Sequence, residues 1–254
     1  MSNPARTAIS LLNQLGWSEP SDMTMEDIAW ASGLVVRYSE MDGSQGRILM
    51  SIDEGIITIN STISYQPKIN YILAHEIGHA QLHRDLSLFS DNEKTLSEWY
   101  AHGPQEKEAN IFAAELLMPA DLFTRKVKRK KLDLPLIEEV AMYFGASKTA
   151  AFLRYRELGD FPVMIIFIEG GIIKWKSPSE DFPYKWLLPE TKLPPFTVAG
   201  DYFYRKVEEK RPVKVNAIEW FPEDYTCLRN PEARLWEQCF PSTTNSIVTC
   251  LWTA

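Results

Sequence analysis

The chain has 254 residues, of which 45% are hydrophobic and 24% charged, fractions that are ordinary for a globular protein. A net charge of −7 at pH 7 argues against a protein whose main task is to coat nucleic acid or an anionic membrane. No apolar run approaches the roughly 18 residues that span a bilayer, and we see no signal peptide. Cys227, Cys239 and Cys250 are odd in number and widely spaced, which fits a reducing compartment. These features predict a cytoplasmic protein with no membrane partner.

Hydrophobic spacing and turn residues predict two helices and three strands at the start of the chain. A helix over 4–16 ends at Gly16, and Thr24 with Asp27 resembles a capping box that opens a short helix ending at Gly33. Segments rich in β-forming residues and separated by turn signals then predict strands at 34–41, 47–52 and 56–60.

Two longer helices follow, and each begins with a proline, as the first turn of a helix prefers. The first covers about 67–83, and the second runs from 104 to 118, where Pro119 prevents its continuation. The polar stretch between them, 85–103, is expected to form a loop and is a candidate lid.

Two or three further helices are expected over 120–158, and part of this segment resembles a helix-turn-helix. Residues 137–155 read as a helix, a turn at Gly145 and a second helix. The basic run over 126–131 is a candidate nucleic-acid surface, but the acidic chain and the acidic pair at 138–139 favour packing. We therefore expect a structural role here, and direct nucleic-acid binding is the less favoured alternative.

The chain changes character near residue 159, where we expect a domain boundary. Residues 161–168 and 172–176 read as the strands of a hairpin whose turn is Gly170-Gly171. The rest of the chain is rich in aromatic residues, which form a core or a partner surface more often than a small-molecule pocket. Its tryptophans are Trp175, Trp186, Trp220, Trp236 and Trp252.

The segment His75-Glu76-Ile77-Gly78-His79 carries the most informative chemistry of the chain. Because residues four apart share one face of a helix, His75 and His79 can grip one metal ion, and the pattern fits zinc. Glu76 can then act as the general base toward a metal-activated water in peptide hydrolysis. The same pattern arises by chance on surface helices, but here the helix is apolar and a second, acidic helix follows it.

A third metal ligand is required. His83 extends the stripe of histidines, but at 1.5 Å per residue it lies about 12 Å along a straight helix from His75, so one ion cannot bind all three. His83 is expected to form hydrogen bonds or to pack, and His102 to be solvated in the loop. The candidates on the second helix are Glu106, Glu108 and Glu115.

Two segments together resemble the ImmA/IrrE family of metallo-endopeptidases. The first is Leu73 to His83, which contains the His-Glu-x-x-His motif, and the second is Glu106 to Pro119, with the sequence EKEANIFAAELLMP. The second is the more discriminating, and the resemblance covers about 5–158.

The family pattern implies roles for four residues of the second segment. Glu106 would be the third metal ligand, with Glu108 as the fallback, and Asn110 would orient a ligating histidine. Glu115 would lie on a helix face or in a salt bridge. Zinc is the implied cofactor, with Mn²⁺ as an activating substitute.

The resemblance implies an α+β fold in three parts. A gluzincin-like zinc peptidase domain, in which a small sheet packs on the active-site helix, would occupy 1–119. A helical helix-turn-helix-like segment would follow over 120–158. An α/β domain over 159–254 would occupy the position of the sensor-like domain in longer, IrrE-like radiation-response regulators, so a sensor or partner-binding role is expected. The strand over 56–60 would form the sheet edge that binds an extended substrate, with an ordinary core strand as the alternative.

The leading hypothesis for function is a zinc-dependent endopeptidase that cleaves a protein, and the family implies a helix-turn-helix transcriptional repressor encoded nearby. The runner-up is a regulatory or binding protein without proteolytic activity, in which the metal site is structural or vestigial. A DNA-binding regulator is a third possibility. The intact set of ligands and base favours the first, and analysis of bound zinc distinguishes it from the second.

Overall fold

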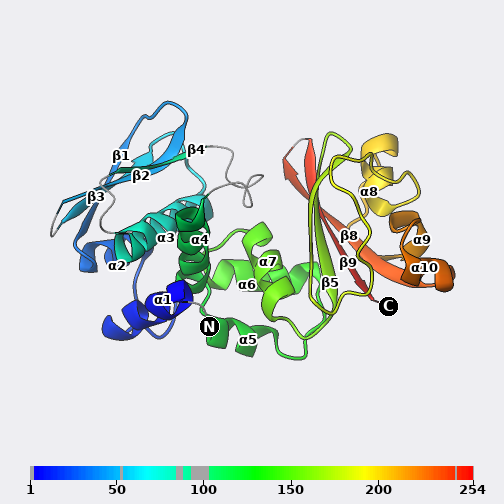
Figure 1. The fold of residues 1–254 in the computed structure, drawn as a ribbon, viewed down its shortest axis with the longest axis horizontal. Coiled ribbons are helices and arrows are strands. Elements are labelled where there is room, and N and C mark those ends of the chain that lie inside the picture. The colour runs from blue at the N-terminus through cyan, green and yellow to red at the C-terminus, as the bar shows by residue number, and fades with distance from the viewer. Residues whose placement is uncertain (1–2, 52–53, 84–87, 93–102, 244, 254) are drawn as a thin grey trace. The chain divides into compact units, whose positions relative to one another are not determined.

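The computed structural model describes residues 3–51, 54–83, 88–92, 103–243 and 245–253. The fold is α+β, with helices and two sheets among these residues, as the sequence predicts (Figure 1). The chain divides into two compact units. Unit 1 comprises Met1–Phe123 and Glu139–Ala150, and unit 2 comprises Thr124–Glu138 and Ala151–Ala254. The division into three domains at 119 and 158 stays a prediction.

Unit 1 begins with helices α1 (Asn3–Gln14) and α2 (Met25–Ala31). The predicted capping box is present, because the Thr24 hydroxyl accepts a hydrogen bond from the Asp27 N–H while the Asp27 carboxylate accepts one from the Thr24 N–H. Gly16 follows α1 with a φ of +69°, a conformation that glycine adopts without steric cost.

Four strands form the sheet of unit 1: β1 (Leu34–Ser39), β2 (Ser44–Met50), β3 (Gly55–Asn60) and β4 (Leu88–Asn92). Their order is β1-β3-β2-β4, in which β1 and β3 are parallel while β2 is antiparallel to both of its neighbours.

This order corrects two predictions about the sheet. Residues 56–60 belong to the interior strand β3, so the expected substrate-binding edge is wrong. The physical reason is that β1 and β2 cover both sides of β3, whose Ile57 and Ile59 are fully buried. The stretch 85–103 is not entirely loop, because 88–92 pairs with β2 as the edge strand β4.

Helices α3 (Gln66–Leu82) and α4 (Pro104–Leu117) lie side by side next to this sheet (Figure 1). Two glycines allow the close approach. A Cβ atom on Gly78 would lie 3.1 Å from Phe112 Cδ1 of α4, and one on Gly46 of β2 would lie 2.3 Å from Ile72 Cγ2 of α3. Side chains larger than hydrogen at these positions would therefore force α3 away from its neighbours.

Three helices follow, α5 (Ala120–Val127), α6 (Leu134–Tyr143) and α7 (Lys148–Leu158), which agrees with the number expected. The predicted turn between α6 and α7 is present, with Gly145 at a φ of +59°. Ser147 Oγ accepts a hydrogen bond of 3.1 Å from the Ala150 N–H and so caps α7.

Unit 2 contains an antiparallel sheet in the order β6-β5-β9-β8-β7. The predicted hairpin is present as β5 (Val163–Glu169) and β6 (Ile172–Pro178), and both glycines of its turn have positive φ. The other strands are β7 (Val213–Asn216), β8 (Arg234–Thr243) and β9 (Ser246–Thr253).

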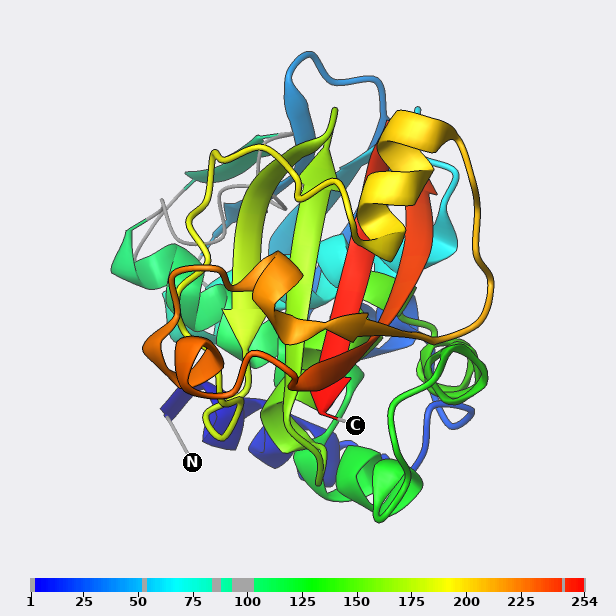
Figure 2. The same ribbon diagram turned by 90° about the vertical axis from the view of Figure 1, so that its right-hand side faces the viewer.

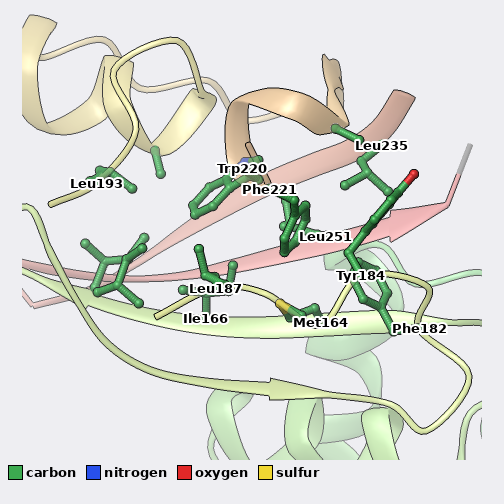
Figure 3. Close-up of a cluster of buried hydrophobic side chains, with 14 of the residues drawn as sticks. Met164, Ile166, Phe182, Tyr184, Leu187, Leu193, Trp220, Phe221, Leu235 and Leu251 are labelled. Carbon is green, nitrogen blue, oxygen red and sulfur yellow. The ribbon is translucent and has the colours of Figure 1, made fainter. Parts of the chain in front are cut away.

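Short helices cover one face of this sheet (Figure 2). They are α8 (Val198–Gly200), which continues as the π-helical turn η1 (Asp201–Arg205), α9 (Ala217–Trp220) and α10 (Tyr225–Arg229). Figure 3 shows the apolar core between the sheet and these helices, where Met164 and Leu251 lie opposite Trp220 and Phe221. Aromatic residues of this unit therefore lie both in the core and at the surface, since Trp220 is 1% exposed whereas Trp186 is 61% exposed.

The described helices include none with the length and apolar character needed to cross a membrane. Cys227, Cys239 and Cys250 are free thiols.

Candidate metal centre

Helix α3 presents three polar side chains of the motif to the interior of unit 1. His75 and His79 are 1% exposed and Glu76 is fully buried, although polar side chains normally avoid such surroundings. The helix is enclosed because β2 packs on one side of it and α4 on the other. Burying these side chains is costly unless they are paired, so their partners decide what the site can do.

The structure brings Glu106 of α4 to both histidines of α3. His75 Nε2 lies 3.2 Å from one Glu106 carboxylate oxygen, His79 Nε2 lies 3.3 Å from the other, and the two Nε2 atoms are 3.0 Å apart. Within the described part of the chain, these three residues form the group of histidine and carboxylate side chains that could hold a metal ion.

This donor set fits zinc. Two imidazole nitrogens and a carboxylate are typical ligands of a catalytic zinc site, which leaves a fourth position for water or substrate. Ligands bound at about 2.0–2.2 Å in a tetrahedron lie roughly 3.3–3.6 Å from one another. The observed separations of 3.0–3.3 Å therefore need only small adjustments to accept the ion.

The electrostatics of the cluster favour a cation. Burial lowers the pKa of His79, which keeps its imidazole neutral and able to ligate. Burial alone would raise the pKa of Glu106, but the nearby imidazoles of His75 and His79 outweigh it and hold that pKa well below its usual range. Glu106 is therefore a carboxylate at neutral pH, ready to bind a positive ion.

Glu76 follows His75 on α3 and lies against strand β2. A Cβ atom on Gly46 would be 3.1 Å from Glu76 Oε1, so the glycine provides the space that the carboxylate occupies. The predicted base therefore lies on the same helix as the two histidines and between them in sequence.

Asn110 of α4 contacts His75 at Nδ1, the ring nitrogen that does not face Glu106. Asn110 Oδ1 lies 3.0 Å from His75 Nδ1 and also accepts a hydrogen bond from the Tyr71 hydroxyl. Because the amide oxygen can only accept, His75 Nδ1 is the donor, and Nε2 is left to face Glu106. The sequence predicts a contact between Asn110 and a ligating histidine, but it places Tyr71 only on the apolar side of the helix. The spacing of four residues between Tyr71 and His75 is the signal for their shared face.

The other candidate residues lie outside the three-residue cluster. Glu108 Oε2 contacts His83 Nε2 at 2.8 Å, and Glu115 is buried, where it accepts a hydrogen bond from the Ala120 N–H at the start of α5. His102, and the candidate lid apart from β4 and Gly103, lie outside the described residues.

Comparison with known proteins gives the family. The chain belongs to the peptidase family whose model is described as the IrrE N-terminal-like domain, and that model matches residues 29–156, about half of the chain. The match includes α3 and α4, and thus all residues of the candidate metal centre.

Two relatives match part of the chain. Uncharacterized immunity region protein 2 of Bacillus phage phi105 is 34% identical over 106 residues, which are 41% of this chain and 62% of that protein. Metallopeptidase ImmA of Bacillus subtilis (strain 168) is 27% identical over 116 residues, 43% of this chain and 60% of that protein. The chain thus spans about three fifths of the length of these relatives.

A solved structure described as a Mycobacterium tuberculosis transcriptional regulator has a similar fold. Its TM-score is 0.62 at 13% sequence identity, and the match covers 100% of this chain and 77% of that one. At this identity the similarity concerns the fold alone.

Proposed function

We propose that the protein is a zinc-dependent endopeptidase in which His75, His79 and Glu106 bind the ion and Glu76 is the general base. The observation that carries this proposal is the convergence of two imidazoles and one carboxylate, from two helices, at separations of 3.0–3.3 Å. Asn110 orients His75 within this site.

Each residue has a distinct task in peptide hydrolysis. When bound, zinc polarises the scissile carbonyl and lowers the pKa of a water molecule. The Glu76 carboxylate accepts the proton of the attacking water and can return it to the leaving amine. Its buried position excludes bulk water, so the electrostatic attraction between the carboxylate and the proton is less screened than in water. Mn²⁺ is the expected activating substitute, because it accepts the same nitrogen and oxygen ligands.

The proposed substrate is a protein, and specifically a helix-turn-helix transcriptional repressor encoded near this chain. The support comes from the relatives: one is named a metallopeptidase and the other an immunity region protein of a phage. A peptidase that removes a repressor would connect the two names. We place the activity in the cytoplasm, where such a repressor acts.

Incubation of the full chain with the neighbouring repressor and zinc or manganese tests this function. We expect one or a few cleavage products by mass spectrometry with the wild-type protein, and a loss of at least about 100-fold in rate with Glu76→Gln. Glu180→Gln is the matched control, because Glu180 is exposed in unit 2. Unchanged cleavage by Glu76→Gln would remove the general base from the proposal. Bound zinc without cleavage of any tested repressor would favour the binding-protein alternative.

A further inference from the structure

His79, the second of the two histidines proposed to bind the metal, has a further contact outside the three-residue cluster. His83 is the residue that ends α3, and its backbone N–H donates to the His79 carbonyl at 2.8 Å. His83 Nδ1 lies 3.3 Å from His79 Nδ1, and His83 Nε2 lies 2.8 Å from Glu108 Oε2. A continuous chain of contacts thus runs from Glu108 through His83 to His79.

Metal binding at His79 Nε2 would fix the direction of the hydrogen bonds in this chain of contacts. A carboxylate can only accept, so His83 Nε2 carries a hydrogen and donates it to Glu108. A His79 ring that binds a metal through Nε2 carries its hydrogen on Nδ1, and a His83 ring with its hydrogen on Nε2 offers Nδ1 as the acceptor. The His83–Glu108 pair therefore accepts the hydrogen bond that a His79 ring bound to a metal through Nε2 donates.

We propose that His83 and Glu108 are positioning residues of the metal centre, which hold His79 in its metal-binding tautomer and fix the plane of its ring. This inference rests on the proposed function, from which it takes zinc as the bound ion. It extends that function by giving Glu108, the fallback ligand, a role outside the cluster.

The two ligating histidines are therefore supported by different chemistry. His75 contacts the amide oxygen of Asn110, which is 6% exposed. His79 instead contacts the imidazole of His83, which in turn contacts the Glu108 carboxylate. The His83 side chain is 9% exposed and that of Glu108 is 49% exposed, so this second support reaches the protein surface. Substitution of Glu108 consequently removes no core packing, which makes it a clean probe.

A purely structural role is the competing explanation, because the His83–Glu108 pair also ties the end of α3 to the start of α4. An exposed ion pair of this kind contributes little to stability. The two explanations differ in what they require of residue 108: a positioning role requires an acceptor atom, and a tie between charges requires a negative charge. Glu108→Gln keeps an acceptor oxygen and loses the charge, whereas Glu108→Ala loses both.

The first measurement is the tautomer of His83 in the metal-free full chain, by long-range ¹H–¹⁵N NMR. We expect the Nε2–H tautomer in wild type and in Glu108→Gln, and a mixture in Glu108→Ala. A wild-type His83 with its hydrogen on Nδ1 would overturn the proposal. Because no metal is present, this result does not depend on the proposed peptidase activity.

The second measurement is zinc affinity by competition with a chromophoric chelator. Loss of a residue that orients a ligand typically weakens metal binding by about 10–100-fold, and we expect this for His83→Ala and Glu108→Ala. Glu108→Gln should bind zinc nearly as tightly as wild type, and so should Gln105→Ala, an exposed control on the same helix. Equal affinity of wild type and Glu108→Ala, or equal weakening in Glu108→Ala and Glu108→Gln, would overturn the positioning role.

These measurements distinguish a failure of the proposed peptidase function from a failure of the positioning role. If the variants weaken zinc binding as expected but wild type cleaves no repressor, the positioning role stands and the peptidase proposal fails. If wild type binds no zinc, the metal centre itself is wrong, and the positioning role fails with it whatever the tautomer of His83.

Discussion

Among the described residues, Glu76 and Glu237 are the carboxylates with no solvent exposure, and their surroundings differ. Glu76 follows His75 on α3, where a Cβ atom on Gly46 would lie 3.1 Å from its Oε1, and its role as the general base stays a proposal. Glu237 lies in the core of unit 2, where one oxygen accepts a hydrogen bond from the Ala199 N–H and the other from Trp220 Nε1. It thus anchors α8 and α9 to strand β8.

Glu237 should make the stability of the chain depend on pH. Burial raises the pKa of Glu237 above 4.5, although its hydrogen bonds act in the opposite direction. Since the folded-state pKa is the higher one, its favourable contribution is complete below the unfolded-state pKa and is lost as pH rises through the folded-state pKa. We expect wild type to lose more free energy of unfolding in urea than Glu237→Gln as the pH rises above 4.5.

The comparison of slopes is decisive because glutamine cannot release a proton. Glu180→Gln, at an exposed position of the same unit, should keep the wild-type slope. Identical slopes for wild type and Glu237→Gln would show that Glu237 titrates alike in the folded and unfolded chains.

At the scale of elements, the position of α3 against β2 depends on Gly46. A methyl group there would lie 2.3 Å from Ile72 Cγ2, which is closer than real side chains approach, and 3.1 Å from Glu76 Oε1. The same backbone position therefore controls both the packing of the helix and the placement of the proposed base.

Gly46→Ala should lower the free energy of unfolding by about 1–3 kcal/mol, the usual cost of overpacking a core. Ile72→Ala removes the methyl group that the added Cβ atom at position 46 would strike, so the double variant should be more stable than the sum of the single effects predicts. Urea denaturation of the four proteins measures this coupling. Strictly additive effects would mean that the two residues do not meet in the folded chain.

The sequence predicts the elements of unit 1 well and their pairing poorly. Helix ends are encoded locally, by the capping box at Thr24 and by the prolines at 67 and 104, and these helices begin and end within about two residues of expectation. Strand order is not local, because nothing in the sequence of 56–60 says that both of its sides are paired. The sequence does not predict strand β4, because a five-residue strand in a polar stretch offers no clear alternation of apolar and polar residues.

For the candidate site, the sequence again predicts the individual residues but not the contacts between helices that support them. Helical spacing brings His75 and His79 to one face and excludes His83 from the same ion, and the structure places Glu106 beside the first two. The spacing cannot show what lies behind the ligands, since Tyr71 and Glu108 reach their partners only when α3 and α4 pack together. Supporting contacts between helices are therefore the part of the site that needs a structure.

At the scale of the whole molecule, the family match covers 29–156, which leaves most of unit 2 without a family assignment. Unit 2 carries exposed aromatic side chains, among them Trp186, Phe196 and Tyr225, and its core is complete without them. A sensor or partner-binding role for 159–254 stays a proposal. The candidate metal centre, by contrast, lies on α3 and α4 of unit 1.

The central claim is that one metal ion is bound by His75, His79 and Glu106, and zinc K-edge X-ray absorption of the zinc-loaded full chain tests it most directly. We predict one zinc per chain with two imidazole nitrogens at about 2.0–2.1 Å and oxygen ligands at about 2.0–2.2 Å. Glu106→Ala should lose a carboxylate oxygen from this shell, while Glu108→Ala should keep it. A sulfur shell at about 2.3 Å, a shell of oxygen alone, or a spectrum unchanged by Glu106→Ala would contradict the assignment.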